Sequence, residues 1–381
     1  MSILPMATAE SVSPNPRTSA NRTAGEPRRV ALISLRFKPA FVSHMIAFAK
    51  ACNALGYAVE YLVDPAYADF ADLVAVAPLR AYRGSLSLNG YTHAIVMNVS
   101  PAHETLVAKL KLFGTRVIYL YHEPRERLVD GIRTEGIVRE LKLTLAYLLS
   151  IRMLKAADAV IVPSQYGMKV YEKRDFRYNG APHRIPLLFD DESSTLPGQQ
   201  QRRYFSYIGA ICRSHGFDMF LSFARYCLEN ELPIQFLIAS ADPMPEHDSC
   251  DQLIQRSPHK FKIQCGRPLQ TDEINVCFRE SICVWNLYRR STQSGVLPKC
   301  FMFGTPVLAT DTGAFSEFVQ DGVNGKFVAA ENPGAIYAAY LEIQSRFQEY
   351  SFNARNAFLN TFYFGSQLEN LRRVLLTGTS Y

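Results

Sequence analysis

Apolar runs of strand length alternate with amphipathic stretches of helix length along most of this chain of 381 residues. The run VALISL over 30–35 suits a strand that is buried on both faces. A loop and a helix over 41–55 follow it, and Gly56 is placed to cap that helix. A second apolar run over 59–64 completes a unit of strand, helix and strand. Such a unit opens a doubly wound parallel sheet, whose ligands bind beyond the carboxyl ends of the strands.

Further strands of the same kind are predicted over 93–99, 116–123 and 158–163. The polar stretch 191–203 then interrupts the pattern with a glycine and a run of glutamines, which is typical of a linker. We therefore predict an N-terminal Rossmann-like domain over 28–190, followed by that linker.

The alternation resumes after the linker. A strand over 204–208 is followed by Gly209, a short loop and a helix, and another strand is predicted over 281–290. This second series predicts a C-terminal Rossmann-like domain over 204–345, and helices over 346–381 close the chain. The fold class is therefore α/β, with two doubly wound domains.

Composition fits a globular protein, with 48% hydrophobic and 20% charged residues. The eight cysteines form no CxxC pair, which is typical of reduced, mostly buried thiols in a cytosolic protein. Residues 1–27 are rich in Ser, Pro, Thr and Ala and contain no apolar run of signal-peptide length. We expect them to form a disordered leader.

Positive charge is concentrated in the first half of the chain. Residues 1–190 contain 24 Lys and Arg against 16 Asp and Glu, whereas residues 191–381 contain 17 against 19. This imbalance predicts that the first half faces an acidic partner more than the second half does.

The stretch from Ser291 to Gly325 has the order expected of a nucleotide site: a loop, a helix over 297–303, a tight turn, a buried strand over 307–309 and a glycine-containing loop. A glycine before a helix lets backbone amides approach an anion, and the first helical turn carries partial positive charge. A diphosphate fits such a site. The groups that we expect to hold it lie at Ser294, Gly295 and Val296.

The segment FGTPVLATDTGAFSEFVQDGVNG resembles the donor-binding segment of retaining GT-B glycosyltransferases of family 4. DAVIVPSQYG, which begins at Asp158, resembles another segment of that family. The resemblance implies a GT-B architecture, in which two Rossmann-like domains face a central cleft and the last helix crosses back to the N-terminal, acceptor-side domain. It also implies retaining, metal-independent transfer from a nucleotide-diphosphate sugar, with no cofactor and no metal site. Glu317 would hydrogen-bond hydroxyls of the donor sugar.

The chain departs from the family at two glutamates that are normally separated by seven residues. Their positions are occupied by Ser291 and Lys299. Lys299 would place a cation near the diphosphate, with a solvated helix lysine as the alternative, and Gln293 and Ser294 would supply neutral hydrogen bonds.

Three further donor contacts are predicted in the loop after the strand 204–208. Gly209 opens it, and the family's arginine and lysine positions fall on Ala210 and His215. Arg213 lies in the same loop and is our candidate phosphate cation, assisted by His215 when that residue is protonated. The alternative is that both are ordinary surface residues.

In the first domain, His122 ends the strand of YLYHEP, where a family histidine contacts the donor sugar. We therefore predict it as the catalytic residue, with a purely structural histidine as the alternative. The first loop carries Arg36, Phe37 and Lys38 in place of the family's glycines. These residues suggest an acidic or extended acceptor, although a basic surface loop would look the same.

A long helix is predicted over 133–157, with Leu141, Leu145 and Leu148 at helical spacing and several lysines and arginines. Charges interrupt its apolar run well before the roughly 20 residues that a membrane span needs. Two interpretations remain open: the helix packs on its own sheet, or its basic face meets an anionic membrane that carries a lipid-linked acceptor.

Together these features predict a hexosyltransferase-type glycosyltransferase that moves a sugar from a nucleotide-diphosphate sugar to a glycan or lipid-linked acceptor, in surface polysaccharide or glycolipid synthesis. We expect a cytoplasmic protein with peripheral contact at the inner face of the membrane and no nucleic-acid partner. The alternatives are a catalytically weak GT-B relative that acts by binding, which the missing glutamates favour, and a GT-B sugar-nucleotide epimerase. The sequence shows no cluster of acids and histidines suited to the epimerase.

Overall fold

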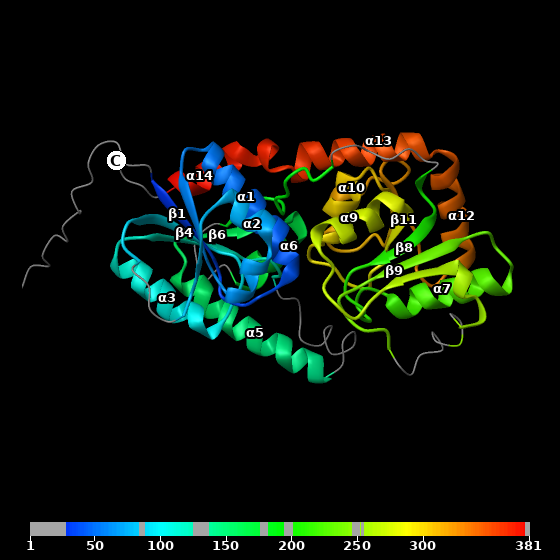
Figure 1. The fold of residues 1–381 in the computed structure, drawn as a ribbon, viewed down its shortest axis with the longest axis horizontal. Coiled ribbons are helices and arrows are strands. Elements are labelled where there is room, and N and C mark those ends of the chain that lie inside the picture. The colour runs from blue at the N-terminus through cyan, green and yellow to red at the C-terminus, as the bar shows by residue number, and fades with distance from the viewer. Residues whose placement is uncertain are drawn as a thin grey trace, which may run out of the picture.

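The computed structural model describes residues 28–83, 88–124, 137–175, 182–193, 201–245, 252 and 255–377. These residues form two α/β domains that lie side by side along the long axis of the molecule (Figure 1). The predicted leader, 1–27, and most of the predicted linker lie outside the described residues.

The first domain is built on a seven-stranded sheet in the order β3-β2-β1-β4-β5-β6-β7, and every neighbouring pair is parallel. Its strands are β1 (Arg29–Ser34), β2 (Ala58–Val63), β3 (Leu79–Ala81), β4 (Tyr91–Val96), β5 (Arg116–Leu120), β6 (Ala159–Val162) and β7 (His183–Arg184). Its helices are α1 (Val42–Ala54), α2 (Ala71–Val76), α3 (Pro101–Leu112), α5 (Ile137–Ala156) and α6 (Gln165–Arg174), with 3-10 turns at Pro39–Phe41 and Pro65–Asp69.

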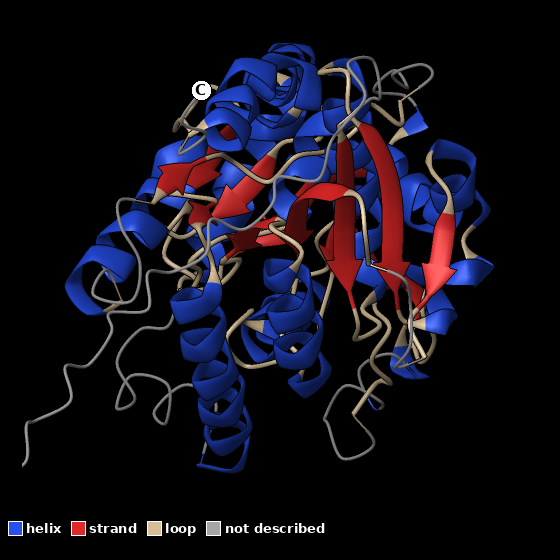
Figure 2. Cartoon of the chain, turned by 90° about the vertical axis from the view of Figure 1, so that its left-hand side faces the viewer, coloured by secondary structure: helices blue, strands red, loops and turns tan. Residues whose placement is uncertain are grey.

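Successive residues of the central strands point to opposite faces of this sheet and enter two separate cores. Leu32 of β1 joins a core with α1 and α2, whereas its neighbour Ile33 joins a core with α3 and α5. Both side chains are fully buried. Helices therefore cover both faces, which is why the strands read as continuous apolar runs (Figure 2).

The second domain repeats this plan with six parallel strands in the order β10-β9-β8-β11-β12-β13. The strands are β8 (Tyr204–Ile208), β9 (Gln235–Ala239), β10 (Phe261–Gln264), β11 (Ser281–Asn286), β12 (Val307–Ala309) and β13 (Gly325–Phe327). The helices are α7 (Phe217–Glu229), α9 (Thr271–Glu280), α10 (Val296–Met302), α11 (Phe315–Phe318) and α12 (Pro333–Ser345), with a 3-10 turn at Pro258–Lys260. In both sheets the strand order reverses at the centre, between β1 and β4 and between β8 and β11, and ligands bind at such switch points.

The chain crosses between the domains twice, and the two crossings touch. Phe189 on the way out pairs with Tyr363 on the way back. Before this return, α13 (Phe347–Ala357) packs on α10, and a π-helical turn (Phe358–Phe362) follows. After it come a 3-10 turn (Phe364–Gln367) and α14 (Leu368–Leu376), which buries Leu371, Val374 and Leu375 in the first domain.

The C-terminal end of α14 is held by two side chains of the first sheet. Arg116 donates hydrogen bonds to the carbonyls of Val374 (2.7 Å) and Leu375 (3.0 Å). The Nε2 atom of His93 lies 2.9 Å from the Leu375 carbonyl. These contacts satisfy carbonyls that have no partner within the helix, so the last helix is an integral part of the first domain.

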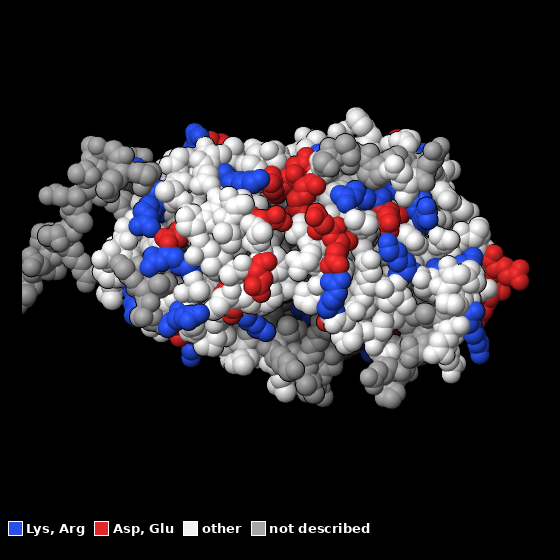
Figure 3. All heavy atoms as spheres, viewed as in Figure 1, with Lys and Arg blue, Asp and Glu red and all other residues white. Residues whose placement is uncertain are grey.

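Three consecutive acids at the outgoing crossing pair with three different elements. Asp190 pairs with Lys50 of α1, Asp191 with Arg355 of α13 and Glu192 with Lys299 of α10. Figure 3 shows acidic side chains gathered along the junction of the domains on the face that it draws. Asp190 thus ties the crossing to the first domain, whereas Asp191 and Glu192, at the start of the predicted linker, tie it to helices α13 and α10.

Helix α5 packs on its own sheet, as the first interpretation of its sequence expected, but not through the leucines at helical spacing. Leu141, Leu145 and Leu148, at helical spacing, are 65%, 63% and 51% exposed, so this stripe does not pack on the sheet. The buried side of the helix is formed instead by residues such as Met153 and Leu154. Within the part of the chain that the structure describes, no helix has the length and apolarity to cross a bilayer.

Candidate functional site

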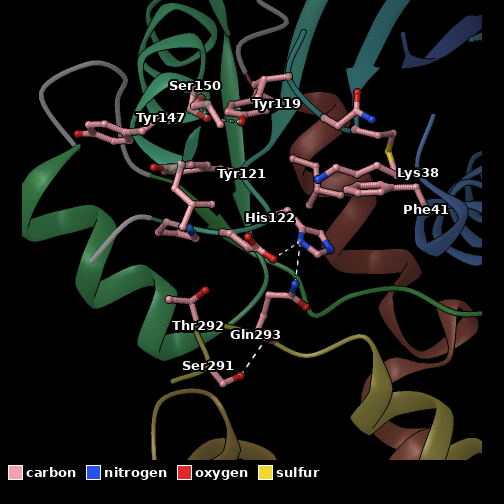
Figure 4. Close-up of a pocket in the computed structure, with 18 of the residues that line it drawn as sticks. Lys38, Phe41, Tyr119, Tyr121, His122, Tyr147, Ser150, Ser291, Thr292 and Gln293 are labelled. Atoms are coloured by element: carbon pink, nitrogen blue, oxygen red, sulfur yellow. Dashed lines mark hydrogen bonds and ion pairs between the residues drawn. The ribbon is translucent and has the colours of Figure 1, made fainter. Parts of the chain in front are cut away.

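A cavity of about 390 Å³ lies between the two domains (Figure 4). Its walls come from segments that follow strands in both sheets, so the carboxyl ends of the two sheets face the same space. The first-domain wall includes Lys38, Phe41, Asn98, Tyr119, Tyr121, His122, Glu123, Leu143, Tyr147 and Ser150. The second-domain wall consists of Ala210, Ser214, His215, Arg290, Ser291, Thr292 and Gln293.

Two hydrogen bonds join the walls across the domain boundary. The Gln293 amide lies 2.7 Å from Nδ1 of His122, and the hydroxyl of Ser164 donates to the carbonyl of Thr292 at 2.7 Å. Both second-domain partners lie in the loop between β11 and α10. That loop therefore links the domains at the cavity (Figure 4).

His122 is neutral in this setting. Burial, followed by the charges of His44 and Lys38, lowers its pKa well below the usual value for histidine. Because the Gln293 amide donates to Nδ1, the ring proton is on Nε2, which is buried and has no hydrogen-bond partner among the described residues. The side chain predicted as catalytic thus presents an unused N–H donor.

Considering only the residues that the structure describes, four buried polar atoms of cavity-lining residues lack a hydrogen-bond partner, and they come from both domains. They are Oδ1 of Asn98, Nε2 of His122, Nδ1 of His215 and Oε1 of Gln293. Leaving such a group unpaired costs about 1–3 kcal/mol. Two of these atoms, Oδ1 of Asn98 and Oε1 of Gln293, can only accept, so their partner must be a donor such as a hydroxyl and not an ionised phosphate. The arrangement therefore favours a ligand rich in hydroxyls.

The loop after β8 contacts the start of α10. Gly209 has φ of +127°, and a Cβ there would lie 3.3 Å from a methyl group of Val296. The ring of His215 stacks on Tyr288 with centroids 4.2 Å apart. The predicted donor loop and the predicted helix start are therefore neighbours, and Gly209 is needed for their close approach.

Ser294, Gly295 and Val296 are half-buried and follow directly on Gln293. The Ser294 hydroxyl accepts a hydrogen bond from the Leu297 amide at 3.3 Å. A Cβ on Gly295 would lie 3.9 Å from Nε2 of His44, so this helix start approaches the first domain. These three residues adjoin the cavity and do not line it.

Arg213 is exposed and is not on the cavity wall. Its carbonyl accepts hydrogen bonds from Arg289 (2.7 Å) and from the Gly216 amide (3.1 Å), so its backbone braces the loop. The second-domain arginine that lines the cavity is Arg290, which the sequence analysis did not select. The sequence signal for Arg290 was its place in the loop that follows β11. The neighbouring Arg289 forms an ion pair with Asp218 and does not line the cavity.

Lys299 is placed differently from both predictions made for it. It is only 7% exposed, which excludes a solvated lysine, and it is not among the cavity-lining residues. Its ammonium group pairs with Glu192 and lies 3.3 Å from Oδ1 of Asn275. The reason is the direction of its side chain, which leaves α10 on the side that faces the interdomain crossing.

The carboxylate of Glu317 also interacts with other residues of the protein. It pairs with Arg184 of β7 and accepts a hydrogen bond from the Gln165 amide at 2.6 Å, so it bridges the domains at the start of α6. It does not line the cavity. The amide of Gln165 lies at the start of α6, where an N–H group has no acceptor within the helix, which is why it attracts a carboxylate.

Ser291, at the first of the two substituted glutamate positions, is buried, and its hydrogen bonds hold the loop between β11 and α10 in place. Its carbonyl accepts a hydrogen bond from the Ala314 amide at 3.0 Å, and its hydroxyl donates to the Gln293 carbonyl at 3.1 Å.

Across the described residues, no group of three or more His, Cys, Asp or Glu side chains is placed to hold a metal ion.

Two facing Rossmann-like domains with a shared cavity and a returning C-terminal helix define the GT-B class of fold. Residues 202–345 match the family model described as "Glycosyl transferases group 1". This match covers the second domain and agrees with the glycosyltransferase resemblance that the sequence predicted for it.

Comparison with solved structures supports the same fold over nearly the whole chain. Sucrose-phosphate synthase from Thermosynechococcus elongatus is 14% identical, with a TM-score of 0.63 over 91% of this chain and 98% of that one. A glycosyltransferase from Rickettsia africae is 12% identical (TM-score 0.65; 93% and 100% covered). Anabaena HepE, solved in complex with UDP, is 14% identical (TM-score 0.64; 91% and 99% covered). A comparison with curated proteins finds no match.

Proposed function

We propose that this protein transfers a hexose from a nucleotide-diphosphate sugar to a hydroxyl of a glycan or lipid-linked acceptor. The observation that carries the proposal is the interdomain cavity, where unpaired buried polar atoms from both domains converge beside a group 1 glycosyltransferase domain. Anabaena HepE, a structural neighbour, has been solved with UDP and with UDP-glucose. We therefore take a UDP-sugar as the first donor to test.

The diphosphate would lie against the second-domain wall. Arg290 is an arginine of that wall, and the loop that contains Ala210, Ser214 and His215 lines the same space. The amides at the start of α10, around Gly295, adjoin it. A cation and oriented amides stabilise negative charge as it builds on a leaving group, so transfer would need no divalent metal.

The donor sugar would lie between Gln293 and His122. Both side chains line the cavity, and the Nε2–H donor of His122 and the Oε1 acceptor of Gln293 are buried atoms that have no hydrogen-bond partner among the described residues. In the reaction, the bond from the anomeric carbon to the diphosphate oxygen breaks and a bond to the acceptor oxygen forms. The acceptor proton passes to the departing diphosphate. Retention of configuration is the outcome that we propose from the family resemblance.

We also propose that α5 brings the protein to an anionic membrane. Its exposed stripe of Leu141, Leu145 and Leu148 is unpartnered by described residues, and Lys155 is exposed at its C-terminal end. Leu143 and Tyr147 of the same helix line the cavity. A bilayer at the stripe would place the acceptor side of the cavity near lipid, as synthesis of a glycolipid or a lipid-linked polysaccharide at the inner face requires.

The absence of carboxylates at Ser291 and Lys299 supports a second candidate, a GT-B protein that binds nucleotide sugars without efficient turnover. Two measurements separate the candidates. Thermal unfolding should show stabilisation by UDP, about 2.7 kcal/mol at a hundred times its Kd. Incubation with UDP-glucose should then release UDP for a transferase, with glycoside or free glucose as the second product.

Stabilisation without UDP release would favour the binding protein. Unchanged melting with UDP, UDP-glucose and the corresponding GDP compounds would refute the donor assignment. GDP compounds that stabilise where UDP compounds do not would keep the function and change the base.

A further inference from the structure

The first-domain wall of the cavity contains a loop, 35–38, whose backbone is fixed by buried side chains. The amide of Leu35 donates to Nε2 of His103 at 3.1 Å, and the amide of Lys38 donates to the hydroxyl of Tyr67 at 3.1 Å. Asn98 donates to the carbonyl of Arg36 at 2.8 Å. Tyr67 and His103 are fully buried and Asn98 is 6% exposed, so these partners are themselves immobile. The loop is therefore preorganised.

This rigid loop carries Lys38 into the cavity. The side chain lines the space, and its ammonium group lies 5.4 Å from the centre of the Phe41 ring (Figure 4). Among the described residues, no acidic side chain forms an ion pair with Lys38. A charged group held at a cavity wall without a protein counter-ion is suited to bind an anionic ligand.

Asn98 adds a second, independent feature. Its amide nitrogen donates both to the Ser34 hydroxyl (2.8 Å) and to the Arg36 carbonyl. Because a carbonyl can only accept, the orientation of the amide is fixed, and the oxygen faces away from the loop. That Oδ1 atom is buried, has no hydrogen-bond partner within the described part of the chain and belongs to a residue that lines the cavity. It needs a donor such as a sugar hydroxyl.

We propose that Lys38 and Asn98 form an acceptor subsite for a sugar that carries a phosphate ester. Lys38 binds the phosphate, and Oδ1 of Asn98 accepts a hydrogen bond from a hydroxyl of the same molecule. This inference rests on the proposed function and adds the chemical class of the acceptor. It assigns the donor diphosphate to the opposite wall, where Arg290 lies, so each substrate has a cation of its own.

The phosphate ester has two sources, a water-soluble sugar phosphate or a sugar on a polyprenyl diphosphate. Binding is measured by calorimetry on the full chain saturated with UDP, with glucose 1-phosphate, farnesyl-diphosphate-linked glucose and glucose as probes. We expect at least one phosphate ester to bind tenfold or more tightly than glucose. The tighter of the two esters identifies the source.

The variant Lys38→Gln should abolish that preference, and Lys38→Arg should keep most of it. Arg36→Gln is the matched control, because Arg36 is an exposed cation of the same loop that does not line the cavity. It should keep the full preference. The Kd of UDP should stay within twofold in all three variants.

Equal binding of glucose and both esters, or binding of none of the three, would overturn the acceptor subsite. So would a Lys38→Gln variant that weakens UDP as much as it weakens the esters, because Lys38 would then belong to the donor site. A wild-type protein that does not bind UDP at all would instead overturn the proposed function itself.

Discussion

The side chains of His122 and Gln293 meet 2.7 Å apart across the domain boundary, although 171 positions separate them in the chain. His122 follows β5 of the first sheet and Gln293 lies in the loop after β11 of the second, so the contact exists only when the carboxyl ends of the two sheets face each other. The contact between His122 and Gln293 also affects the chemistry of the histidine. The contact fixes the tautomer of His122, so the ring carries its proton on the buried Nε2 atom.

Replacement of His122 by Ala should lower turnover of the sugar nucleotide by about 10²–10³-fold, the usual effect of losing one oriented donor at the transition state. UDP itself should still bind with nearly the same Kd, because we propose that the diphosphate binds against the other domain. UDP release and calorimetry with UDP measure the two effects. His259→Ala, at a histidine that does not line the cavity, is the control and should match the wild type. Equal losses in kcat and UDP affinity would assign His122 to nucleotide binding.

Stability should fall as the pH falls from about 6.5 towards 4. Burial lowers the pKa of His44 and of His103 to about 4, from the usual value of 6.5. The unfolded chain therefore takes up protons in this range that the folded chain does not, and each pKa unit of difference corresponds to about 1.4 kcal/mol. Urea unfolding at pH 7.5 and pH 5 measures the loss.

The matched variant for this prediction is His103→Gln, whose amide oxygen can still accept the hydrogen bond from the Leu35 amide. It should reduce the difference between the two pH values. Equal stability of the wild type at pH 7.5 and pH 5 would contradict the assignment of these histidines as neutral in the folded state.

The sequence predicted the fold well because the relevant signal is local. Runs such as 30–35 are apolar at every position, as strands covered on both faces must be, and they predicted β1 and its partners close to their observed bounds. The contact between Gly209 and Val296 was also foreseeable in outline, since both follow central strands of one sheet. Strand order then brings them together.

Side-chain direction was much less predictable. Lys299 and Glu317 lie in the predicted segments, but their charges are used by Glu192 and by Arg184, residues from other parts of the chain. The leucine stripe on α5 is a second example of a feature whose surroundings could not be predicted from the sequence. Helical spacing reveals an apolar face, but only the packing of neighbouring elements determines whether that face is covered.

The ion pair between Lys299 and Glu192 should be a structural requirement. Lys299→Ala would leave a carboxylate without its partner in a largely buried place, which costs about 3–5 kcal/mol. Lys299→Glu, which restores the residue type typical of the family, should be at least as harmful because two carboxylates would then face each other. The charge-reversed double variant, Glu192→Lys with Lys299→Glu, should recover much of the loss. Urea unfolding of the four proteins tests this, and a stable Lys299→Glu single variant would contradict it.

Gly313 should tolerate no side chain, because its φ is +59° and a Cβ would lie 1.8 Å from the Ser291 carbonyl oxygen. Gly313→Ala should therefore destabilise the protein and also weaken UDP binding, since Ser291 lies in the cavity wall. Gly322→Ala is the matched control: its φ is +74°, and no atom lies within 4 Å of the added carbon. It should cost only the left-handed strain of about 1–2 kcal/mol and leave UDP binding unchanged. Equal effects of the two substitutions would show that the contact with Ser291 is unimportant.

The exposed stripe on α5 makes the membrane proposal directly testable. Burying a leucine side chain in lipid contributes about 1.5–3 kcal/mol, so the double variant Leu145→Asp/Leu148→Asp should lose at least tenfold in affinity for vesicles containing an anionic phospholipid. Its melting temperature and UDP binding should be preserved, since both leucines are more than half exposed. Phe352→Asp, at a 66% exposed apolar residue of α13, is the control and should bind vesicles like the wild type. Vesicle co-sedimentation measures the affinity, and a wild type that sediments equally with neutral and anionic vesicles, or with neither, would contradict the proposed contact.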